Sequence, residues 1–187
     1  LPIGEWVLRT ACRQVREWHA AGLPAGRVAV NVSPVQFSQR EFRGMVAQIL
    51  RETGLEPALL ELEITESLMM RDEEWTKQLL ADLRALGVSV AIDDFGIGYS
   101  NLRRLSEFSV SRLKIDRSLV QDVESLGRNT AIVTAMVSMA RALGLDVVAE
   151  GVENFDQLLQ LQDQQCNEVQ GFLLSRPLPA GDAGQLL

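Results

Sequence analysis

The sequence has few of the residues on which several common kinds of site depend. It contains one histidine, His19, and two cysteines, Cys12 and Cys166, which lie far apart and form no CxxC motif. Because His19 lies in a polar run near a helix end and has no second histidine to join it, we expect neither a histidine zinc site nor a Ser-His-Asp triad. The cysteine spacing argues against a disulfide framework and against a thiolate zinc site.

Basic charge and long apolar runs are also scarce. The net charge is −7, which argues against a generic DNA-binding face, although an acidic protein can hold a phosphodiester when cations cover its carboxylates. The most apolar helix-like stretch, residues 131–145, is interrupted by Ser138 and Arg141, so it is expected to be a core helix. With no signal peptide visible, the sequence predicts no membrane contact from this segment.

The length and composition that are present fit one globular domain spanning residues 1–187. The chain has 187 residues, of which 47% are hydrophobic, and these values exclude a disordered protein. It begins at Leu1 without an initiator Met and enters a helix almost at once. The sequence is therefore expected to have been cut from a longer protein.

Strand and helix patterns alternate from end to end. Such β-then-α units predict a parallel sheet with helices outside it. The expected strands are residues 28–32, 59–65, 88–94, 110–116, 145–150 and 168–173, and the expected helices are residues 5–20, 38–52, 72–86, 129–143 and 154–162, with a short helix before residue 110.

The distribution of polar residues favours a closed barrel over an open doubly wound sheet. Along Val88 to Asp93, large aliphatic residues alternate with Ser89, Ala91 and Asp93, and four other strands show a similar pattern with a charge or amide near the C-terminal end. An open sheet covered by helices would bury apolar residues on both faces. We therefore predict an α/β fold of the (β/α)8 TIM-like barrel type. Only six of its eight strands are visible, so the first strands are expected before Leu1.

Six polar residues are predicted to gather at the C-terminal mouth of this barrel. Carboxylate and amide oxygens without thiolate or imidazole suit Mg²⁺ or Mn²⁺. Two such ions could share Asp93 and clamp a phosphodiester at a separation of about 4 Å. The six residues are Asn31, Glu63, Asp93, Asp94, Lys114 and Glu150.

Several of these residues also have a purely structural interpretation. Lys114 can be a buried salt-bridge partner, or it can orient a water molecule and neutralise charge on phosphorus. Asp93 and Asp94 could cap a helix, although Phe95-Gly96 is a poor helix start. Glu66 could likewise be a cap or brace a neighbouring loop. Glu61, one layer deeper, is expected in an internal ion pair.

Six motifs, in order and at matching intervals, resemble the EAL domain family. They cover essentially the whole chain. The motifs are Asn31 to Ser33, Glu63 to Glu66, Asp93 to Ser100, Leu113 to Asp116, Ala149 to Glu153 and Gln170 to Leu173.

The resemblance implies a phosphodiesterase that hydrolyses cyclic di-GMP to linear pGpG with Mg²⁺ or Mn²⁺, two ions per site. Asn31, Glu63 and Asp93 would hold one ion, and Asp93 would bridge to a second ion held by Asp94 and Glu150. Lys114 would position the attacking water and Glu150 would assist its deprotonation. The outer residues implied are Glu66, which would brace the loop after Asp94, and Glu153 and Gln170.

The resemblance also implies what precedes this chain in the parent protein and how the protein assembles. The Glu-Ala-Leu signature with its metal-binding glutamate is absent from these residues and is expected upstream, so the activity is assigned to the parent protein and the isolated chain is expected to be inactive. Ile97 stands where family members commonly carry threonine, in a loop linked to metal binding and dimer contacts. The family further implies a homodimer, upstream GGDEF or sensory domains, and a cytoplasmic domain whose parent protein can be membrane-anchored.

Two other functions compete with this one. The first is a degenerate, non-catalytic cyclic di-GMP receptor, which is disfavoured because every ligand position visible in the chain is filled. The second is an unrelated metal-dependent barrel lyase or aldolase, which would need a substrate site other than the matched motifs.

Overall fold

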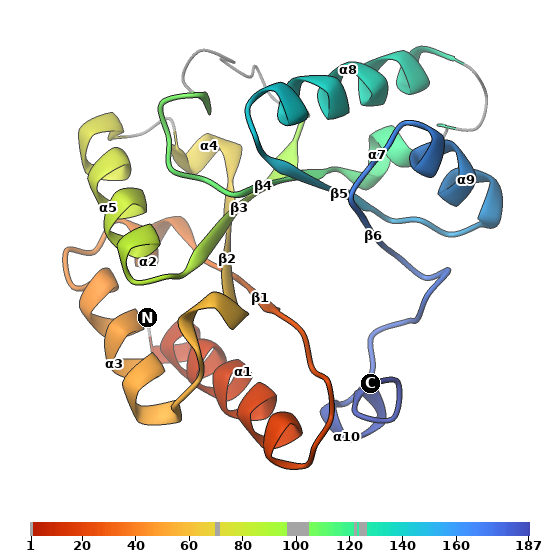
Figure 1. Ribbon diagram of the computed structural model, residues 1–187. Coiled ribbons are helices and arrows are strands. Elements are labelled where there is room, and N and C mark those ends of the chain that lie inside the picture. The colour runs from red at the N-terminus through yellow and green to blue at the C-terminus, as the bar shows by residue number, and fades with distance from the viewer. Residues whose placement is uncertain (1, 70–71, 97–104, 122, 124–126) are drawn as a thin grey trace. The chain divides into compact units, whose positions relative to one another are not determined.

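The fold alternates strands and helices, and the computed structural model describes residues 2–69, 72–96, 105–121, 123 and 127–187. The strands follow one another in the sheet in chain order, and every pair whose register is resolved is parallel (Figure 1). The strands are β1 (Val28–Asn31), β2 (Leu60–Thr65), β3 (Ser89–Phe95), β4 (Arg112–Ile115), β5 (Asp146–Glu150) and β6 (Glu168–Gln170). The helices are α1 (Pro2–Ala20), α2 (Pro34–Phe37), α3 (Phe42–Thr53), the 3₁₀ helix η1 (Pro57–Leu59), α4 (Glu66–Met69), α5 (Glu73–Ala85), α7 (Arg117–Val120), α8 (Arg128–Ala142), α9 (Phe155–Asp163) and α10 (Ala180–Ala183).

The chain divides into two compact units, each of which is described by itself. The first unit comprises Leu1–Ile64, Leu68–Val90 and Leu178–Leu187. The second comprises Thr65–Ser67 and Ala91–Pro177.

In the first unit, α1 packs along β1 and against α3 (Figure 1). The helix buries Leu8, Cys12 and Val15, whose spacing places them on one face, and burial raises the pKa of the Cys12 thiol to about 11. Helix α3 ends at Gly54, which adopts the left-handed conformation (φ 67°) that favours glycine. Helices α1 and α3 thus each bury one stripe of residues, and a left-handed glycine ends α3.

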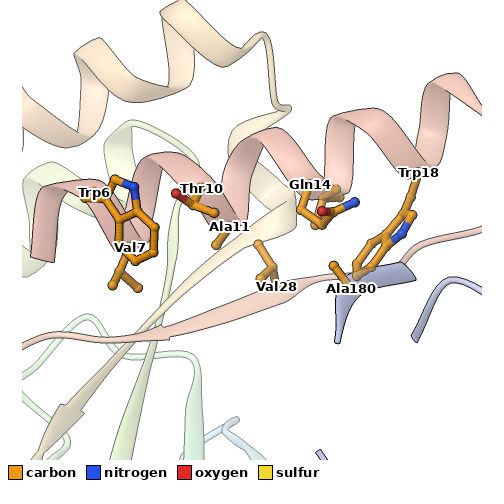
Figure 2. Close-up of a pocket in the computed structure, with 9 residues that line it drawn as sticks. Trp6, Val7, Thr10, Ala11, Gln14, Trp18, Val28 and Ala180 are labelled. Carbon is orange, nitrogen blue, oxygen red and sulfur yellow. The ribbon is translucent and has the colours of Figure 1, made fainter. Parts of the chain in front are cut away.

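An apolar groove of about 320 Å³ runs along α1 where this helix meets β1. Figure 2 shows Trp6 and Trp18 near the two ends of the row, with Val28 of β1 and Ala180 of α10 between them. Trp6 is 64% exposed.

In the second unit, strands β3 to β6 are parallel neighbours, and α7 and α8 pack on β5. Helix α9 begins with a capping box, in which the Asn154 side chain accepts a hydrogen bond from the Gln157 backbone at 2.9 Å. All of β4 is buried, including its two cations, Arg112 and Lys114. The charged side of the predicted alternation is therefore an interior surface.

The expected strands and longer helices are found with shifted ends, and two expected boundaries were wrong. The short helix expected before residue 110 lies largely outside the described residues. The helix expected over residues 38–52 begins only at Phe42. A separate short helix, α2, which was not expected, precedes it and is started by a capping box between Ser33 and Gln36. The last strand ends at Gln170, because Gly171 begins a turn in which Leu174 N–H donates to Gly171 O. The motif residues 97–100, including Ile97, lie outside the described residues. No helix among the described parts of the chain is long and apolar enough to cross a membrane.

Candidate metal centre

The end of β3 carries two consecutive aspartates in an irregular backbone. The register between β3 and β4 shifts between Ile92 and Phe95, which is the signature of a bulge. Asp94 has a φ of 55°, a left-handed conformation that is uncommon for residues other than glycine, and its N–H donates to Oδ1 of Asp93 at 3.1 Å. In a regular strand, neighbouring side chains point to opposite faces. The bulge and the turned backbone explain how both carboxylates serve one site.

Three carboxylates of the second unit converge at this point. Asp93, Asp94 and Glu150 each place one oxygen so that the three atoms lie within 4.8 Å of one another. Lys114, only 4% exposed, joins two of them: its Nζ lies 3.1 Å from Oδ1 of Asp93 and 2.5 Å from Oε1 of Glu150. One ammonium thus faces three carboxylates.

The electrostatics of Asp94 record the excess of negative charge. Its pKa is raised from the usual aspartate value, first by desolvation and then by the charges of Asp93 and Asp116, while Lys114 acts in the opposite direction. A divalent cation would relieve this repulsion. The site therefore has both the donor atoms and the charge that such an ion needs.

Two glycines, Gly151 after β5 and Gly171 after β6, pack closely against their neighbours. Gly151 has a φ of 70°, and a Cβ there would lie 2.4 Å from Cβ of Arg117. A Cβ on Gly171 would lie 2.1 Å from the carbonyl oxygen of Val152. Neither glycine can gain a side chain without a shift of its neighbour.

Two predicted ligands belong to the first unit and are described there. Asn31 and Glu63 are register partners at the ends of β1 and β2, and the Val32 N–H donates to the Glu63 carbonyl at 2.8 Å. Glu63 is buried, as is Glu61 two residues earlier, and Glu61 pairs with Arg27 at 3.1 Å. An ion pair at Glu61 is thus found as expected, but it is not internal, because the Arg27 side chain is 36% exposed.

The three predicted outer residues all lie in the second unit, but their surroundings differ. Glu66 is 8% exposed, and its Oε2 has no hydrogen-bond partner among the residues that the structure describes. Glu153 is exposed and lies 3.8 Å from Nη2 of Arg117. Gln170 is the register partner of Glu150, and its carbonyl accepts the Val152 N–H at 3.1 Å.

Sequence reasoning missed two charged neighbours of this group. Asp116 raises the pKa of Asp94, although its own side chain also caps the next helix by accepting the Ser118 N–H at 2.8 Å. Arg112 is buried two residues before Lys114. The available signal was the alternation along β4, which places Arg112, Lys114 and Asp116 on one face.

The residues fit a hard divalent cation. The clustered donors are carboxylate oxygens, with neither thiolate nor imidazole among them, which suits Mg²⁺ or Mn²⁺. Parallel strands with polar residues at their C-terminal ends are typical of barrel enzymes. Fold and site together define an α/β protein of the parallel-barrel class with a candidate metal centre at its strand ends.

The chain belongs to the EAL domain family, whose model matches residues 1–177. It is similar to MucR of Pseudomonas aeruginosa, described as a bifunctional diguanylate cyclase/cyclic di-GMP phosphodiesterase. The two are 46% identical over 178 residues, which cover 95% of this chain and 26% of MucR. The chain spans about a quarter of the length of the curated relatives it matches.

Solved structures give the same answer for the fold. The phosphodiesterase of MucR, in complex with cyclic di-GMP, matches with a TM-score of 0.92 and 45% identity, over 100% of this chain and 74% of that one. BlrP1 of Klebsiella pneumoniae, in complex with manganese and cyclic di-GMP, matches with a TM-score of 0.84 and 32% identity, over 94% and 44% of the two chains. The predicted barrel-type fold is confirmed, and the chain covers part of that barrel.

Proposed function

We propose that this chain is the core of a phosphodiesterase that hydrolyses cyclic di-GMP to linear pGpG. The observation that carries the proposal is the convergence of Asp93, Asp94 and Glu150 around Lys114. Its support from relatives is that MucR is a cyclic di-GMP phosphodiesterase and that BlrP1 was solved with manganese and the same nucleotide.

The proposed ligands divide between two Mg²⁺ or Mn²⁺ ions. Asn31, Glu63 and Asp93 would hold one ion, and Asp93, Asp94 and Glu150 the other. When bound, such ions supply positive charge at the phosphoryl oxygens. The raised pKa of Asp94 is consistent with this assignment: desolvation is its largest cause, and the negative charges of Asp93 and Asp116, which a cation would offset, add to it.

The chain's own residues would handle the water and its proton. Lys114 Nζ is held between Asp93 and Glu150, so it is oriented to donate a hydrogen bond to a water molecule near both carboxylates. Glu150 would accept the proton as the water oxygen forms its bond to phosphorus and one phosphorus–oxygen ester bond breaks. The departing sugar oxygen would leave with the electron pair of that bond and take up a proton from solvent. The buried ion pair and this water-positioning role are compatible, because an ammonium group has three donor hydrogens.

The outer residues would support this group. Glu66 carries a buried oxygen without a partner among the described residues, and it would brace the segment after Asp94. Gln170 and Glu153 would hold the turn that follows Glu150. We further propose an upstream GGDEF or sensory domain and a homodimer; the first is supported by the description of the relative MucR as a bifunctional diguanylate cyclase/cyclic di-GMP phosphodiesterase.

The test uses the longest form of the protein that contains residues 1–187, freed of metal and supplied with cyclic di-GMP. With Mg²⁺ or Mn²⁺, chromatography should detect pGpG. Asp93→Ala should lower the rate at least about a hundredfold. Asp163→Ala, which removes an exposed carboxylate at the end of α9, is the control and should leave the rate unchanged.

The competing function, a non-catalytic receptor, predicts a different result in the same assay. Its signature is saturable binding of cyclic di-GMP by folded protein without pGpG under either metal. That outcome would reject the hydrolase and retain the nucleotide as a ligand.

A further inference from the structure

Arg112 forms a two-pronged ion pair that reaches from β4 to β6. Its side chain is buried, with the residue 6% exposed. Nη1 donates to Oε2 of Glu168 at 2.8 Å, and Nη2 donates to Oε1 of the same carboxylate at 2.7 Å. Because β5 lies between β4 and β6, the pair spans three adjacent strands. Paired geometry of this kind specifies orientation as well as attraction.

The pair lies on the same face of the sheet as the candidate metal centre, one level below it. Arg112 and Lys114 are two residues apart on β4, so their side chains share a face. Lys114 connects Asp93 of β3 with Glu150 of β5. Arg112 connects β4 with Glu168 of β6. Lys114 thus links β3 to β5, and Arg112, one level below, links β4 to β6.

The far end of β6 contacts the segment that follows Glu150. Glu150 and Gln170 are register partners, and the Val152 N–H donates to the Gln170 carbonyl at 3.1 Å. The Val152 carbonyl accepts the Leu173 N–H at 3.0 Å, so Val152 is held from both sides. Gly171 packs so closely on Val152 that a Cβ would overlap its backbone. A displacement of β6 along its axis would therefore be transmitted to the turn that carries Glu150.

We propose that Arg112 and Glu168 are a positioning pair for Glu150. By holding the start of β6, they set where its end meets Val152, and through Val152 they set the distance of the Glu150 carboxylate from Asp93 and Asp94. The proposal rests on the proposed function, in which Glu150 is a metal ligand. Arg112 acts through other residues and has no part in the chemical step.

The test measures Mn²⁺ binding by calorimetry and hydrogen exchange at Val152 in the longest form that contains residues 1–187. Arg112→Met should weaken Mn²⁺ binding about tenfold, the lower end of the range for residues that orient ligands. It should also speed exchange of the Val152 amide by about threefold or more while the rest of the sheet stays protected. Glu168→Gln, which keeps the shape and removes the charge, should change both in the same direction by less.

Two further variants separate positioning from general stability. The reversed pair, Arg112→Glu combined with Glu168→Arg, should restore part of the Mn²⁺ affinity that Arg112→Glu alone and Glu168→Arg alone lose. Arg141→Met removes an exposed arginine that donates to the Gln165 side chain, near the start of β6, and should change neither quantity. If Arg112→Met does not fold, Glu168→Gln carries the test.

The outcomes distinguish this proposal from the function on which it rests. Wild-type Mn²⁺ affinity in both Arg112→Met and Glu168→Gln, with only the unfolding temperature lowered, would overturn the positioning role. Failure of the wild-type protein to bind Mn²⁺ would reject the metal site. The positioning pair would then be judged by Val152 exchange alone, and unchanged exchange would overturn it.

Discussion

Lys114 and Arg112 are two buried cations on one face of one strand, yet they differ in what surrounds them. Lys114 pairs with Asp93 and Glu150, which are themselves mostly buried, with side chains 14% and 19% exposed. Arg112 pairs with Glu168 and approaches Asp146 at 3.7 Å, and these two carboxylates are about half exposed. Solvent can screen the acids around Arg112, whereas those around Lys114 have much less access to it.

The difference shows where a cation is needed. Around Lys114, three carboxylates face one ammonium, and the pKa of Asp94 is raised as a result of burial and of nearby negative charge. Around Arg112, the guanidinium and the Glu168 carboxylate satisfy each other in a two-pronged pair. We call the residues around Lys114 the upper level and those around Arg112 the lower level. The upper level has too little positive charge and is suited to bind a cation, whereas the lower level is suited to hold strands in place.

The largest expected effect comes from neutralising a carboxylate beside Lys114, compared with the same change beside Arg112. Asp93→Asn should lower hydrolysis at least about a hundredfold, because it removes the charge of the proposed bridging ligand. Asp146→Asn, the matched change at the lower level, should alter hydrolysis by less than about fivefold, since its carboxylate is exposed and only loosely paired. Steady-state rates of pGpG formation measure both. Equal losses of hydrolysis in Asp93→Asn and Asp146→Asn would contradict the assignment of metal binding to the carboxylates around Lys114.

The second prediction compares the cations themselves. Lys114→Met should strengthen Mn²⁺ binding severalfold, because it removes a competing positive charge, yet lower hydrolysis about a hundredfold. Without metal it should also lose roughly 3–5 kcal/mol of stability, because buried carboxylates lose their partner. Arg112→Met should instead weaken Mn²⁺ binding. Calorimetry and thermal unfolding distinguish them, and weaker Mn²⁺ binding by Lys114→Met would contradict the charge argument.

A smaller effect is expected at Gly171, where the end of β6 contacts the segment that follows Glu150. Gly171→Ala should cost about 1–3 kcal/mol in the free energy of unfolding, since the new methyl group meets Val152 backbone atoms that must move. Hydrolysis should fall about tenfold, as the Glu150 turn shifts. The control is Gly181→Ala in α10, where a Cβ meets nothing within 4 Å, and chemical denaturation should find it near wild type. A stable, fully active Gly171→Ala would remove the proposed link between β6 and Glu150.

The smallest expected effect is at the exposed rim. Glu153→Gln breaks a 3.8 Å pair with Arg117 in which both side chains are about half exposed. Such pairs contribute about 0–1 kcal/mol, so the rate of hydrolysis should change by less than about fivefold. A hundredfold loss would show that Glu153 contacts the reacting groups directly, and it would move the boundary of the site outward.

The sequence predicted the features that depend on local periodicity, namely the faces of the strands and the ends of the helices. The alternation along β2 and β4 placed Glu61 and Lys114 on the charged side of their strands, and an ion pair at Glu61 was expected and found, with a partly exposed partner, Arg27. Helix ends followed from residues such as Gly54 and Asn154, whose conformations and capping bonds are local. These features depend on neighbours within a few positions.

The missed features depend on contacts between distant residues. The left-handed turn at Asp94 follows from a register shift between β3 and β4, which no local pattern specifies. The pairing of Arg112 with Glu168 joins residues 56 positions apart and requires the registers of both β4 with β5 and β5 with β6. The short helix α2, with its local capping box, was not expected, because its four residues are too few to show a helical periodicity.

We expect the three carboxylates around Lys114, those of Asp93, Asp94 and Glu150, to need a divalent cation for the hydrolysis of cyclic di-GMP. The most direct measurement follows pGpG formation by the longest form of the protein while metal is removed with a chelator and then restored as Mn²⁺. The account predicts that product formation stops on chelation, resumes on addition of Mn²⁺, and fails to resume in Asp93→Asn. Hydrolysis that continues at full rate in the chelator, or metal-loaded protein that binds cyclic di-GMP and yields no pGpG, would contradict it.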